Sequence, residues 1–313
     1  MLPRSGMVDS PLVIAQVLNY DNELLTIECV DSLMKNDYRN LKILLVDNGS
    51  GAASLGALTA RYGSGGRVTV VHIERNRGYA GGNNRGLAYV REHFPDATYL
   101  YVSDNDTVHD AELISTLVAA AQTRPDFAVI GPKICSYFEQ DRVISAGAYV
   151  NHARGEGMLL HPNERRDQVR GFSEVGYVEG AAMLIRMSVL AQDFLDERLF
   201  TYWEETDFQY RLRSRGHRIG CCADTSVYHR ISGSTPRMKG RRSYYIWRNR
   251  IIFHRRWSSG LLDGFLFNIV TFFVWIPGIA ILQIFKRRQP GIIKYCYWAV
   301  MDGYAGEFGR RVE

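Results

Sequence analysis

Two groups of acidic residues have the types and spacing to act on a phosphate-bearing ligand. The triplet Asp104-Asn105-Asp106 follows a short apolar run, and its two carboxylates are hard oxygen donors suited to Mg²⁺ or Mn²⁺ bound together with substrate phosphates. Farther along, Glu204, Glu205 and Asp207 place three carboxylates within four residues at the start of an expected helix. One of them could act as a general base, although acids in a first turn also suit the helix dipole. The residues therefore indicate a cation that clamps a diphosphate, next to a carboxylate base.

Polar motifs also follow three earlier apolar runs. They are Asn19-Tyr20, Asp47-Asn48-Gly49-Ser50 and the glycine-rich segment 76–84, which reads Asn-Arg-Gly-Tyr-Ala-Gly-Gly-Asn-Asn. Taken alone, the second is typical of a turn with a helix N-cap, and the acidic triplet could be a surface turn. The third lacks the G-x-G-x-x-G spacing and does not follow the first run, so it only weakly indicates a nicotinamide site. Their order along the chain favours one shared ligand site over separate turns.

The first third of the chain alternates short apolar runs with helix-length segments. The runs expected to be strands are Leu12–Leu18, Leu41–Val46, Val68–Ile73 and Tyr99–Val102. The segments expected to be helices are Glu23–Met34, Leu55–Tyr62 and Gly86–His93. This βαβαβ order predicts an α/β fold with parallel strands and right-handed crossovers, whose ligands bind at the carboxyl ends of the strands. All four polar motifs lie at such ends, so we expect them to meet in one crevice.

The second half contributes three further features. The stretch from Gly131 to about Phe172 is rich in Gly and Arg, and we interpret it as a strand and long loops. In segment 178–186, Gly180 and Ala181 lead into an apolar strand; such small residues either admit a ligand close to the backbone or allow tight strand–helix packing. His229 ends the region, and a lone histidine is usually structural.

Together these motifs resemble the family-2 inverting glycosyltransferases of the GT-A fold, specifically the rhamnosyltransferase-like branch that builds bacterial surface polysaccharides. The likeness covers roughly Val13 to Arg250 and five motifs in the family's order. These are the Asp-Asn-Gly-Ser turn, the glycine-rich segment, the acidic triplet, the Gly-Ala-Ala-Met-Leu-Ile-Arg strand and the acidic group before a helix. The family's His-x-x-Gly-x-Ser element looks like 229–234 with one residue inserted before the glycine.

The resemblance implies a role for each matching residue. Asp106 would be the principal metal ligand, with Asp104 by the ribose or a metal-bound water and His229 as a further ligand. Glu205 would be the catalytic base, where the family more often has Asp, with Glu204 and Asp207 as neighbouring candidates. The residues implied in nucleotide-sugar binding are Asn19, Asp47, Asn76, Arg77, Gly78, Asp104, Gly180 and Ala181. Asp47 would contact the base, and Asn76 and Arg77 would lie near the base or diphosphate. The cofactor would be Mg²⁺ or Mn²⁺, and the donor a nucleotide-diphospho sugar, with dTDP-L-rhamnose as the branch's example.

Composition and charge exclude several other classes of protein. The 313 residues, of which 46% are apolar, are enough for one large or two modest domains with a buried core. Of 38 Lys and Arg, eight fall between Arg237 and Arg256, where there is no acid. This basic segment favours phosphate-bearing lipid, a nucleotide or an assembly partner, and a global affinity for nucleic acid is not indicated. The five cysteines never have C-x-x-C spacing, so we expect a reducing cytosol, and we identify no signal peptide.

The segment Leu261–Phe285 is almost wholly apolar, with Asp263 its only charge. It is long enough to cross a membrane, yet we expect Pro277-Gly278 to break it. Basic residues flank both ends, which favours a re-entrant or interfacial hairpin at the cytoplasmic face of the cell membrane. A buried interdomain helix, or one in a homo-oligomer interface, remains the alternative.

We therefore predict a GT-A catalytic domain over 1–236, with a nucleotide-sugar-binding half (9–107) and an acceptor-binding half (108–236). A basic, apolar helical region follows over 237–313. The acceptor would be a glycan or a lipid-linked glycan. The rival functions are a sugar-phosphate nucleotidyltransferase, which would need a glycine-rich loop after the first strand, and a non-catalytic nucleotide- or glycan-binding module.

Overall fold

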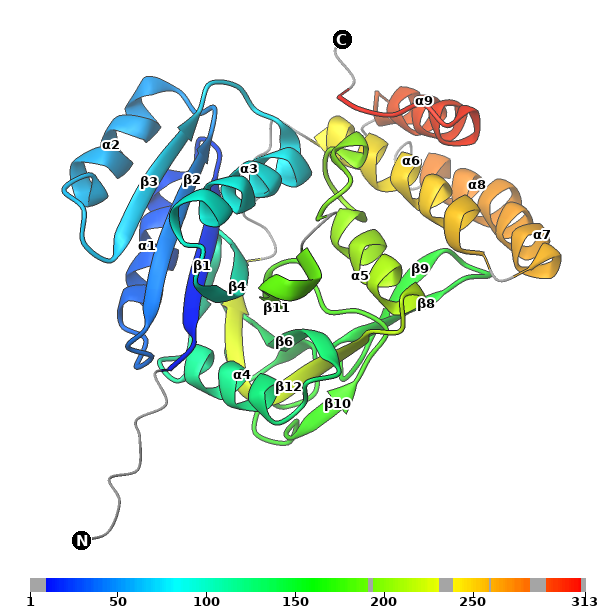
Figure 1. The fold of residues 1–313 in the computed structure, drawn as a ribbon. Helices are drawn as coiled ribbons and strands as arrows, with labels where there is room; N and C mark the ends of the chain where they lie inside the picture. The colour runs from blue at the N-terminus through cyan, green and yellow to red at the C-terminus, as the bar shows by residue number, and fades with distance from the viewer. Residues whose placement is uncertain (1–9, 191–193, 231–238, 259, 282–290, 311–313) are drawn as a thin grey trace, which may run out of the picture.

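Most of the chain forms one mixed β-sheet between two helical layers, with a group of helices at one end (Figure 1). The computed structural model describes residues 10–190, 194–230, 239–258, 260–281 and 291–310. The strands are β1 (Leu12–Asn19), β2 (Leu41–Asn48), β3 (Val68–Ile73), β4 (Ala97–Asp104), β5 (Thr107–His109), β6 (Phe127–Ser136), β7 (Val143–Ser145), β8 (Ala148–Asn151), β9 (Glu156–Leu159), β10 (Phe172–Glu174), β11 (Ala182–Arg186) and β12 (Arg218–His229). The helices are α1 (Glu23–Met34), α2 (Ala52–Tyr62), α3 (Gly78–His93), α4 (Leu113–Gln122), η1 (Met187–Leu190), η2 (Glu197–Leu199), α5 (Glu204–Ser214), α6 (Lys239–Trp257), α7 (Leu261–Ile269), η4 (Val270–Trp275), α8 (Ile276–Ile281) and α9 (Ile292–Ala305).

Alternating residues of each central strand face opposite helical layers. Val13 and Ala15 of β1 pack with α1, α2 and α4 in one core, whereas Ile14 packs with α3 and α5 in the other. A strand that is buried on both faces must be apolar throughout. The continuous apolar runs of the sequence therefore follow from the sandwich of helix, sheet and helix, and the predicted α/β class is confirmed.

The strand order brings the predicted motifs to one edge of the sheet. The order in the main sheet is β10-β12-β6-β11-β4-β1-β2-β3, with β1 to β4 mutually parallel where they pair and β11 antiparallel to both β4 and β6. In the register of the strands, Asn19 lies opposite Asp47, and Leu18 lies opposite Asp104. Chain connections reverse direction between β1 and β4, and this switch point is where open α/β sheets bind ligands.

One helix begins earlier than the sequence suggested. The glycine-rich segment was expected to be a loop before a helix at Gly86, but α3 begins at Gly78. Gly78 has φ +74°, and a Cβ on Gly82 would lie 2.6 Å from Leu18 Cδ1. The glycines thus turn the chain into the helix and let its first turns approach β1 closely. The N-terminus of α3 consequently lies beside the carboxyl end of β1.

The region after Gly131 has more strand than we expected. Gly131 lies in the middle of the ten-residue strand β6, and the short strands β7 to β10 follow it. Between β11 and α5 lie η1 and η2, and the acidic group forms the first turn of α5. The expected apolar strand after Ala181 is confirmed as β11.

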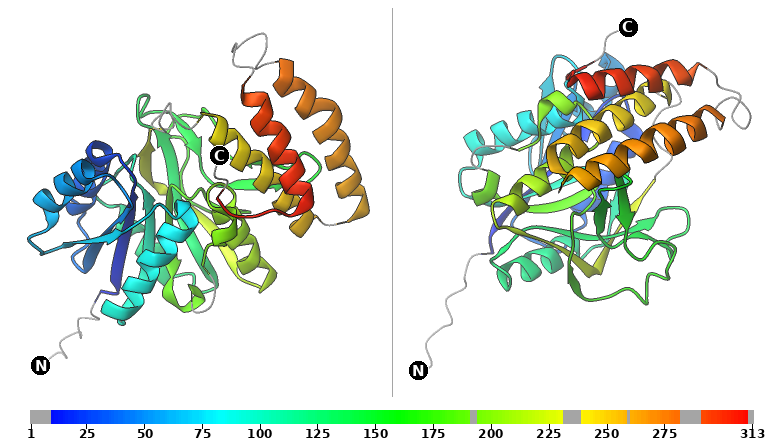
Figure 2. Two further views of the ribbon diagram at one scale, coloured as in Figure 1. Left: turned by 90° about the horizontal axis from the view of Figure 1, so that it is seen from above. Right: turned by 90° about the vertical axis from the view of Figure 1, so that its right-hand side faces the viewer.

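The C-terminal helices α6, α9 and the α7–η4–α8 segment lie side by side at one end of the molecule (Figure 2). Phe267 of α7 stacks on His254 of α6 with ring centroids 3.8 Å apart, and Trp247 of α6 packs edge-on against Trp275. The opposite face of α7 and η4 is open, since Leu262, Phe265 and Phe273 are 62–76% exposed. An 18-residue stretch from Leu261 has a mean hydropathy of 1.6 and is long enough to cross a membrane.

The expected break at Pro277-Gly278 is wrong, because both residues lie inside α8, which continues η4 without interruption. Residues 270–275 form a π-helical turn directly before α8. A π-helical turn is wider than an α-helical one and tolerates a residue without a backbone N–H, such as Pro277. The helix therefore continues through Pro277 instead of ending there. Lys286 to Arg288, on which the hairpin argument also relied, lie outside the described residues.

The basic segment Arg237–Arg256 does not form the open patch that its charge suggested. Arg248 and Arg250 are buried, and four of its arginines donate to groups within the chain. The pairs are Arg248 with Leu199 O, Arg250 with Gly155 O, Arg255 with Gly303 O and Arg256 with Asp207. A guanidinium has five donors and can satisfy several carbonyls at once. Half of the eight basic residues thus support the fold, and Arg242 remains exposed.

Candidate active site

A cluster of hydrogen-bonded polar side chains joins the ends of β1, β2 and β3. Asn19 donates to Asp47 Oδ1 at 2.8 Å and accepts from Thr26 Oγ1 at 2.8 Å. The other oxygen of Asp47 accepts from the His72 ring at 2.9 Å and from the Ser50 backbone N–H at 3.2 Å. Asp47 is fully buried, and its oxygens are fixed by neighbours on all three strand ends. These neighbours thus hold the Asp47 carboxylate in one orientation.

The Asn48 side chain fixes the start of α3. Its Oδ1 accepts from the Arg77 backbone N–H at 3.1 Å, and its Nδ2 donates to Gly78 O at 2.9 Å. Asn76 Oδ1 accepts from the Gly78 N–H at 2.7 Å. Gly49 has φ +79°, and a Cβ there would lie 2.5 Å from Asn76 N, so the two turns touch. Arg77 Nε is buried without a hydrogen-bond partner among the described residues, which leaves it available to an anion.

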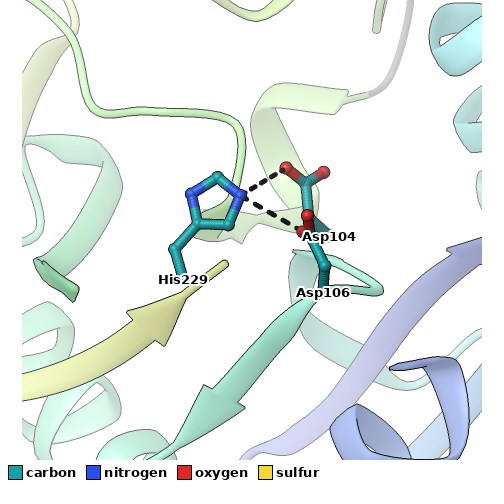
Figure 3. Close-up of side chains that lie close together, drawn as sticks. All are labelled: Asp104, Asp106 and His229. Carbon is teal, nitrogen blue, oxygen red and sulfur yellow. Dashed lines mark ion pairs between the residues drawn. The ribbon is translucent and has the colours of Figure 1, made fainter. Parts of the chain in front are cut away.

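Asp104, Asp106 and His229 point toward one another (Figure 3). Each offers a ligand atom, and these atoms lie within 4.8 Å of one another. His229 Nε2 lies 3.2 Å from Asp106 Oδ1 and 4.0 Å from Asp104 Oδ2. Pairing of β5 with β12 sets this geometry, since His229 lies opposite Thr107. Two carboxylates and an imidazole fit Mn²⁺ well, and Mg²⁺ through the oxygens.

The charges in this trio are mutually dependent. Burial raises the pKa of Asp104 to about 6, and the nearby Asp106 carboxylate adds to the rise. Burial alone would lower the pKa of His229, but the hydrogen bond and charge of Asp106 raise it to about 9. In the absence of a cation, a protonated His229 therefore balances the two carboxylates. A divalent ion can replace that proton, because it binds the same atoms.

The acidic group at the start of α5 separates into three different environments. Asp207 is fully buried and bonded to Arg256 at 2.7 Å, Trp257 Nε1 at 2.9 Å and Arg211 at 3.1 Å, so its carboxylate is occupied. Glu204 is buried, with Oε2 unpartnered among the described residues. Burial, together with the charge of Glu205, raises its pKa well above the ordinary value.

Glu205 has the environment of a general base. It is partly buried, and burial raises its pKa to about 7, against the opposing effect of backbone hydrogen bonds. A base with a pKa near the working pH combines a large deprotonated fraction with a strong tendency to take a proton. The Asp104 backbone N–H donates to Ala181 O, and the preceding residue, Gly180, borders Glu205, so the metal trio and the candidate base belong to one site.

Gly180 and Ala181 lie between these two groups. A Cβ on Gly180 would lie 3.1 Å from Glu205 Cγ and 3.4 Å from the Tyr79 hydroxyl. Ala181 O accepts from the Asp104 backbone N–H at 3.1 Å. The sequence left open whether Gly180 admits a ligand close to the backbone or allows tight packing. The structure shows tight packing, and this packing is against the candidate base, Glu205.

The sequence reasoning gave no role to two residues that the structure brings into the site. Tyr79, in the first turn of α3, donates a hydrogen bond to Gly180 O. Burial raises the pKa of the Tyr79 hydroxyl, and the charges of Asp104 and Glu205 raise it further. Glu179 has a buried, unpartnered Oε2 among the described residues, and its charge acts on His229 and Glu205. The position of Glu179 directly before Gly180 and Ala181 could have indicated a role from the sequence alone. Ile231 to Ser234 of the histidine motif lie outside the described residues.

Comparisons with known proteins identify the family. Residues 15–194 match the family described as "Glycosyl transferase family 2", so the chain belongs to that family. Among curated proteins, it is 24% identical over 242 residues to the low-salt glycan biosynthesis hexosyltransferase Agl10 of Haloferax volcanii, covering 75% of each chain. It is 27% identical over 218 residues to the N-acetylglucosaminyl-diphospho-decaprenol L-rhamnosyltransferase of Mycobacterium tuberculosis, covering 64% of this chain and 69% of that protein.

Solved structures show the same fold. GalNAc-T7 with UDP, GalNAc and Mn²⁺ aligns with a TM-score of 0.61 at 13% identity, over 89% of this chain and 59% of that one. The mannosyltransferase PcManGT of Pyrobaculum calidifontis, with GDP-Man and Mn²⁺, aligns with a TM-score of 0.57 at 14% identity, over 95% of this chain and 88% of that one. The chain is therefore a glycosyltransferase of the GT-A fold that acts in glycan biosynthesis.

Proposed function

We propose that this protein moves a sugar, with inversion, from a nucleotide-diphospho sugar to a glycan or lipid-linked acceptor in polysaccharide biosynthesis. The observation that carries the proposal is the joint placement of the metal trio and Glu205 around Gly180. The donor we propose is dTDP-L-rhamnose, supported by the family branch and by the L-rhamnosyltransferase relative. L-rhamnose as the transferred sugar is a more specific proposal than sugar transfer itself.

The donor would lie across the ends of β1, β2 and β4. Asp47, held by Asn19, would accept a hydrogen bond from the nucleoside base. Asn76, Arg77 and Gly78 would face the diphosphate from the start of α3, where the helix dipole and the free Arg77 Nε favour negative charge. Hydrogen bonds hold Asp47, Asn76 and Gly78 before the donor arrives, so little ordering of these three residues accompanies binding.

Asp106, Asp104 and His229 would hold Mg²⁺ or Mn²⁺. Such an ion neutralises the charge that grows on the departing diphosphate. Arg77 would add to this stabilisation from the side of α3. A nucleoside diphosphate with its charge neutralised is a good leaving group, so this site needs no second carboxylic acid, in contrast to glycoside hydrolases.

Glu205 would take the proton from the acceptor hydroxyl. The hydroxyl oxygen forms a bond to the anomeric carbon while the bond from that carbon to the phosphate oxygen breaks, and the configuration inverts. The proton ends on Glu205 and the electron pair on the nucleoside diphosphate. Gly180 lacks a side chain, so Glu205 can lie directly against its backbone.

We also propose that the protein works at the cytoplasmic face of the cell membrane. One face of α7 and η4 is fixed to α6, since Phe267 and Thr271 are buried, while the other exposes Leu262, Phe265 and Phe273. A helix that is packed on one side and apolar on the other suits the interface of a bilayer. A homo-oligomer contact through the same face is the alternative occupant.

Turnover against a panel of nucleotide sugars, with lipid-linked and free glycan acceptors, tests the function. Release of nucleoside diphosphate together with a glycosylated product of inverted configuration is the expected result. Formation of a nucleotide sugar from a sugar phosphate would identify a nucleotidyltransferase instead. Tight binding of nucleotide sugars without any turnover would identify a binding module.

A further inference from the structure

The segment before the candidate base has a strained backbone. Between η2 and α5, Phe200, Tyr202 and Trp203 have φ values of 68°, 67° and 73°. Residues with a Cβ rarely adopt this left-handed region, and aromatic side chains gain no local hydrogen bond that would favour it. Such a conformation persists only where the surroundings fix it. The segment 199–203, which we call the strained loop, leads directly into Glu204 and Glu205.

Two consecutive residues of α6 hold the strained loop. Asn249 is fully buried, and its Nδ2 lies 2.9 Å from Leu199 O, 2.8 Å from Thr201 O and 2.8 Å from Tyr202 O. Arg248 is 1% exposed and donates to Leu199 O at 2.9 Å. Every donor of the Asn249 amide group is therefore used on this loop, and none on α6 or its neighbouring helices.

A second pair on the same face of α6 holds the helix that follows the loop. Arg256 and Trp257 donate to Asp207 Oδ1 at 2.7 and 2.9 Å. These residues lie two helical turns beyond Arg248 and Asn249, so one stripe of α6 contacts both the strained loop and the first turn of α5. Glu205 lies between the two points of attachment.

The far side of the strained loop touches the donor half. Phe200 O accepts from the Ala80 backbone N–H of α3 at 3.2 Å, and a Cβ on Gly78 would lie 2.2 Å from the same oxygen. The loop is thus enclosed between α3, which faces the donor, and α6. A shift of the loop would displace Glu205, because Glu205 follows the loop directly in the first turn of α5.

We propose that Asn249, assisted by Arg248, is a positioning residue for sugar transfer: its amide holds the strained loop so that Glu205 faces the acceptor. The inference rests on the proposed function of Glu205 as the base. It assigns to α6, in the region expected to serve membrane or partner contacts, a part in forming the active site.

The test compares Asn249→Ala with Arg255→Gln. Arg255 is on the same helix and also donates to backbone carbonyls, Gly303 O and Tyr304 O, but these belong to α9 and its end. In Asn249→Ala we expect turnover to fall by about 10- to 100-fold, because small misplacements of a reacting group are costly. The dissociation constant for the nucleoside diphosphate should change much less than turnover does, since the hydrogen bonds to Asp47 from Asn19 and from the Arg77 backbone to Asn48 come from outside the loop. Arg255→Gln should retain wild-type turnover.

Hydrogen exchange provides a readout that needs no substrate. Peptides spanning 199–208 should exchange faster in Asn249→Ala than in wild type, and not in Arg255→Gln. Unchanged exchange in these peptides, or a loss of turnover no greater than that of Arg255→Gln, would overturn the inference. If Asn249→Ala does not fold, Arg248→Lys, which keeps the charge but loses the fork of donors, is measured in the same way. Absence of transfer by the wild-type protein would refute the proposed function alone, because exchange still decides whether Asn249 holds the loop.

Discussion

The Tyr79 hydroxyl donates a 2.9 Å hydrogen bond to the backbone carbonyl of Gly180, and this bond joins the two halves of the site. Tyr79 belongs to the first turn of α3, on the donor side, whereas Gly180 precedes β11 and borders Glu205. The bond fixes the distance between α3, which we propose to face the diphosphate, and the backbone beside Glu205. A substitution at either residue should therefore affect catalysis more than donor affinity.

We expect Gly180→Ala to lower turnover by about tenfold or more while the nucleoside-diphosphate affinity stays within about threefold. The added Cβ would lie 3.1 Å from Glu205 Cγ, so the carboxylate must move. Gly264→Ala is the matched control, because nothing lies within 4 Å of a Cβ at that position. Equal turnover in the two variants would show that Glu205 has room to adjust.

Single substitutions of the three neighbouring carboxylates should distinguish their roles. Glu205→Gln is expected to lower turnover by at least ~10² with little change in donor binding, because only the proton acceptor is lost. Glu204→Gln should cost less. Asp207→Asn should act mainly through stability, seen as a lower melting temperature, since it weakens bonds to Arg256 and Arg211. A larger loss in Glu204→Gln than in Glu205→Gln would move the catalytic role to Glu204.

The pH dependence of kcat/KM should show an acidic limb near 7. Burial raises the pKa of Glu205 to about 7, and a base must be deprotonated to act. Activity is therefore lost as the pH falls through this value and reaches a plateau above it. Initial rates between pH 5.5 and 8.5 measure the limb. In Glu205→Gln the residual rate should lose this limb, and its persistence would assign the titration to another group.

The sequence predicted the first helix with its observed bounds, Glu23–Met34, and the four strands within one to two residues at their ends. Local apolar patterns carried that information. They could not separate Glu205 from Asp207, because the partners of Asp207 come from Arg256 and Trp257, 49 and 50 residues later.

Two other features depended on the surroundings of a residue. The start of α3 at Gly78 follows from close packing on Leu18 and Phe200, which no local pattern reveals. The strained loop consists of aromatic residues whose backbone is fixed by Asn249. Glycine or asparagine would have indicated positive φ values there, and aromatic residues do not.

Divalent cations should tighten the binding of a nucleoside diphosphate. Calorimetry with Mn²⁺, with Mg²⁺ and with EDTA measures the effect, and Asp106→Ala should abolish it, because Asp106 would supply one of the two carboxylate ligands of the trio. Asp126→Ala is the control, since that carboxylate is exposed and paired with Arg218. Nucleotide affinity that is independent of both the cation and Asp106 would contradict the metal assignment.

The open face of α7 and η4 gives the last prediction. Phe265 and Phe273 are 62% and 76% exposed, and burial of each in lipid would contribute up to about 1.5–3 kcal/mol. The double variant Phe265→Ser, Phe273→Ser should therefore lower partition onto anionic phospholipid vesicles by about tenfold or more. Phe138→Ser is the control, because Phe138 is 69% exposed but lies between β6 and β7. High salt should weaken the binding of the unmodified protein without abolishing it, as expected where apolar burial and charge both contribute. A protein that ignores vesicles but dimerises through this face in sedimentation, with dimerisation lost in the double variant, would assign the surface to a second copy of the chain.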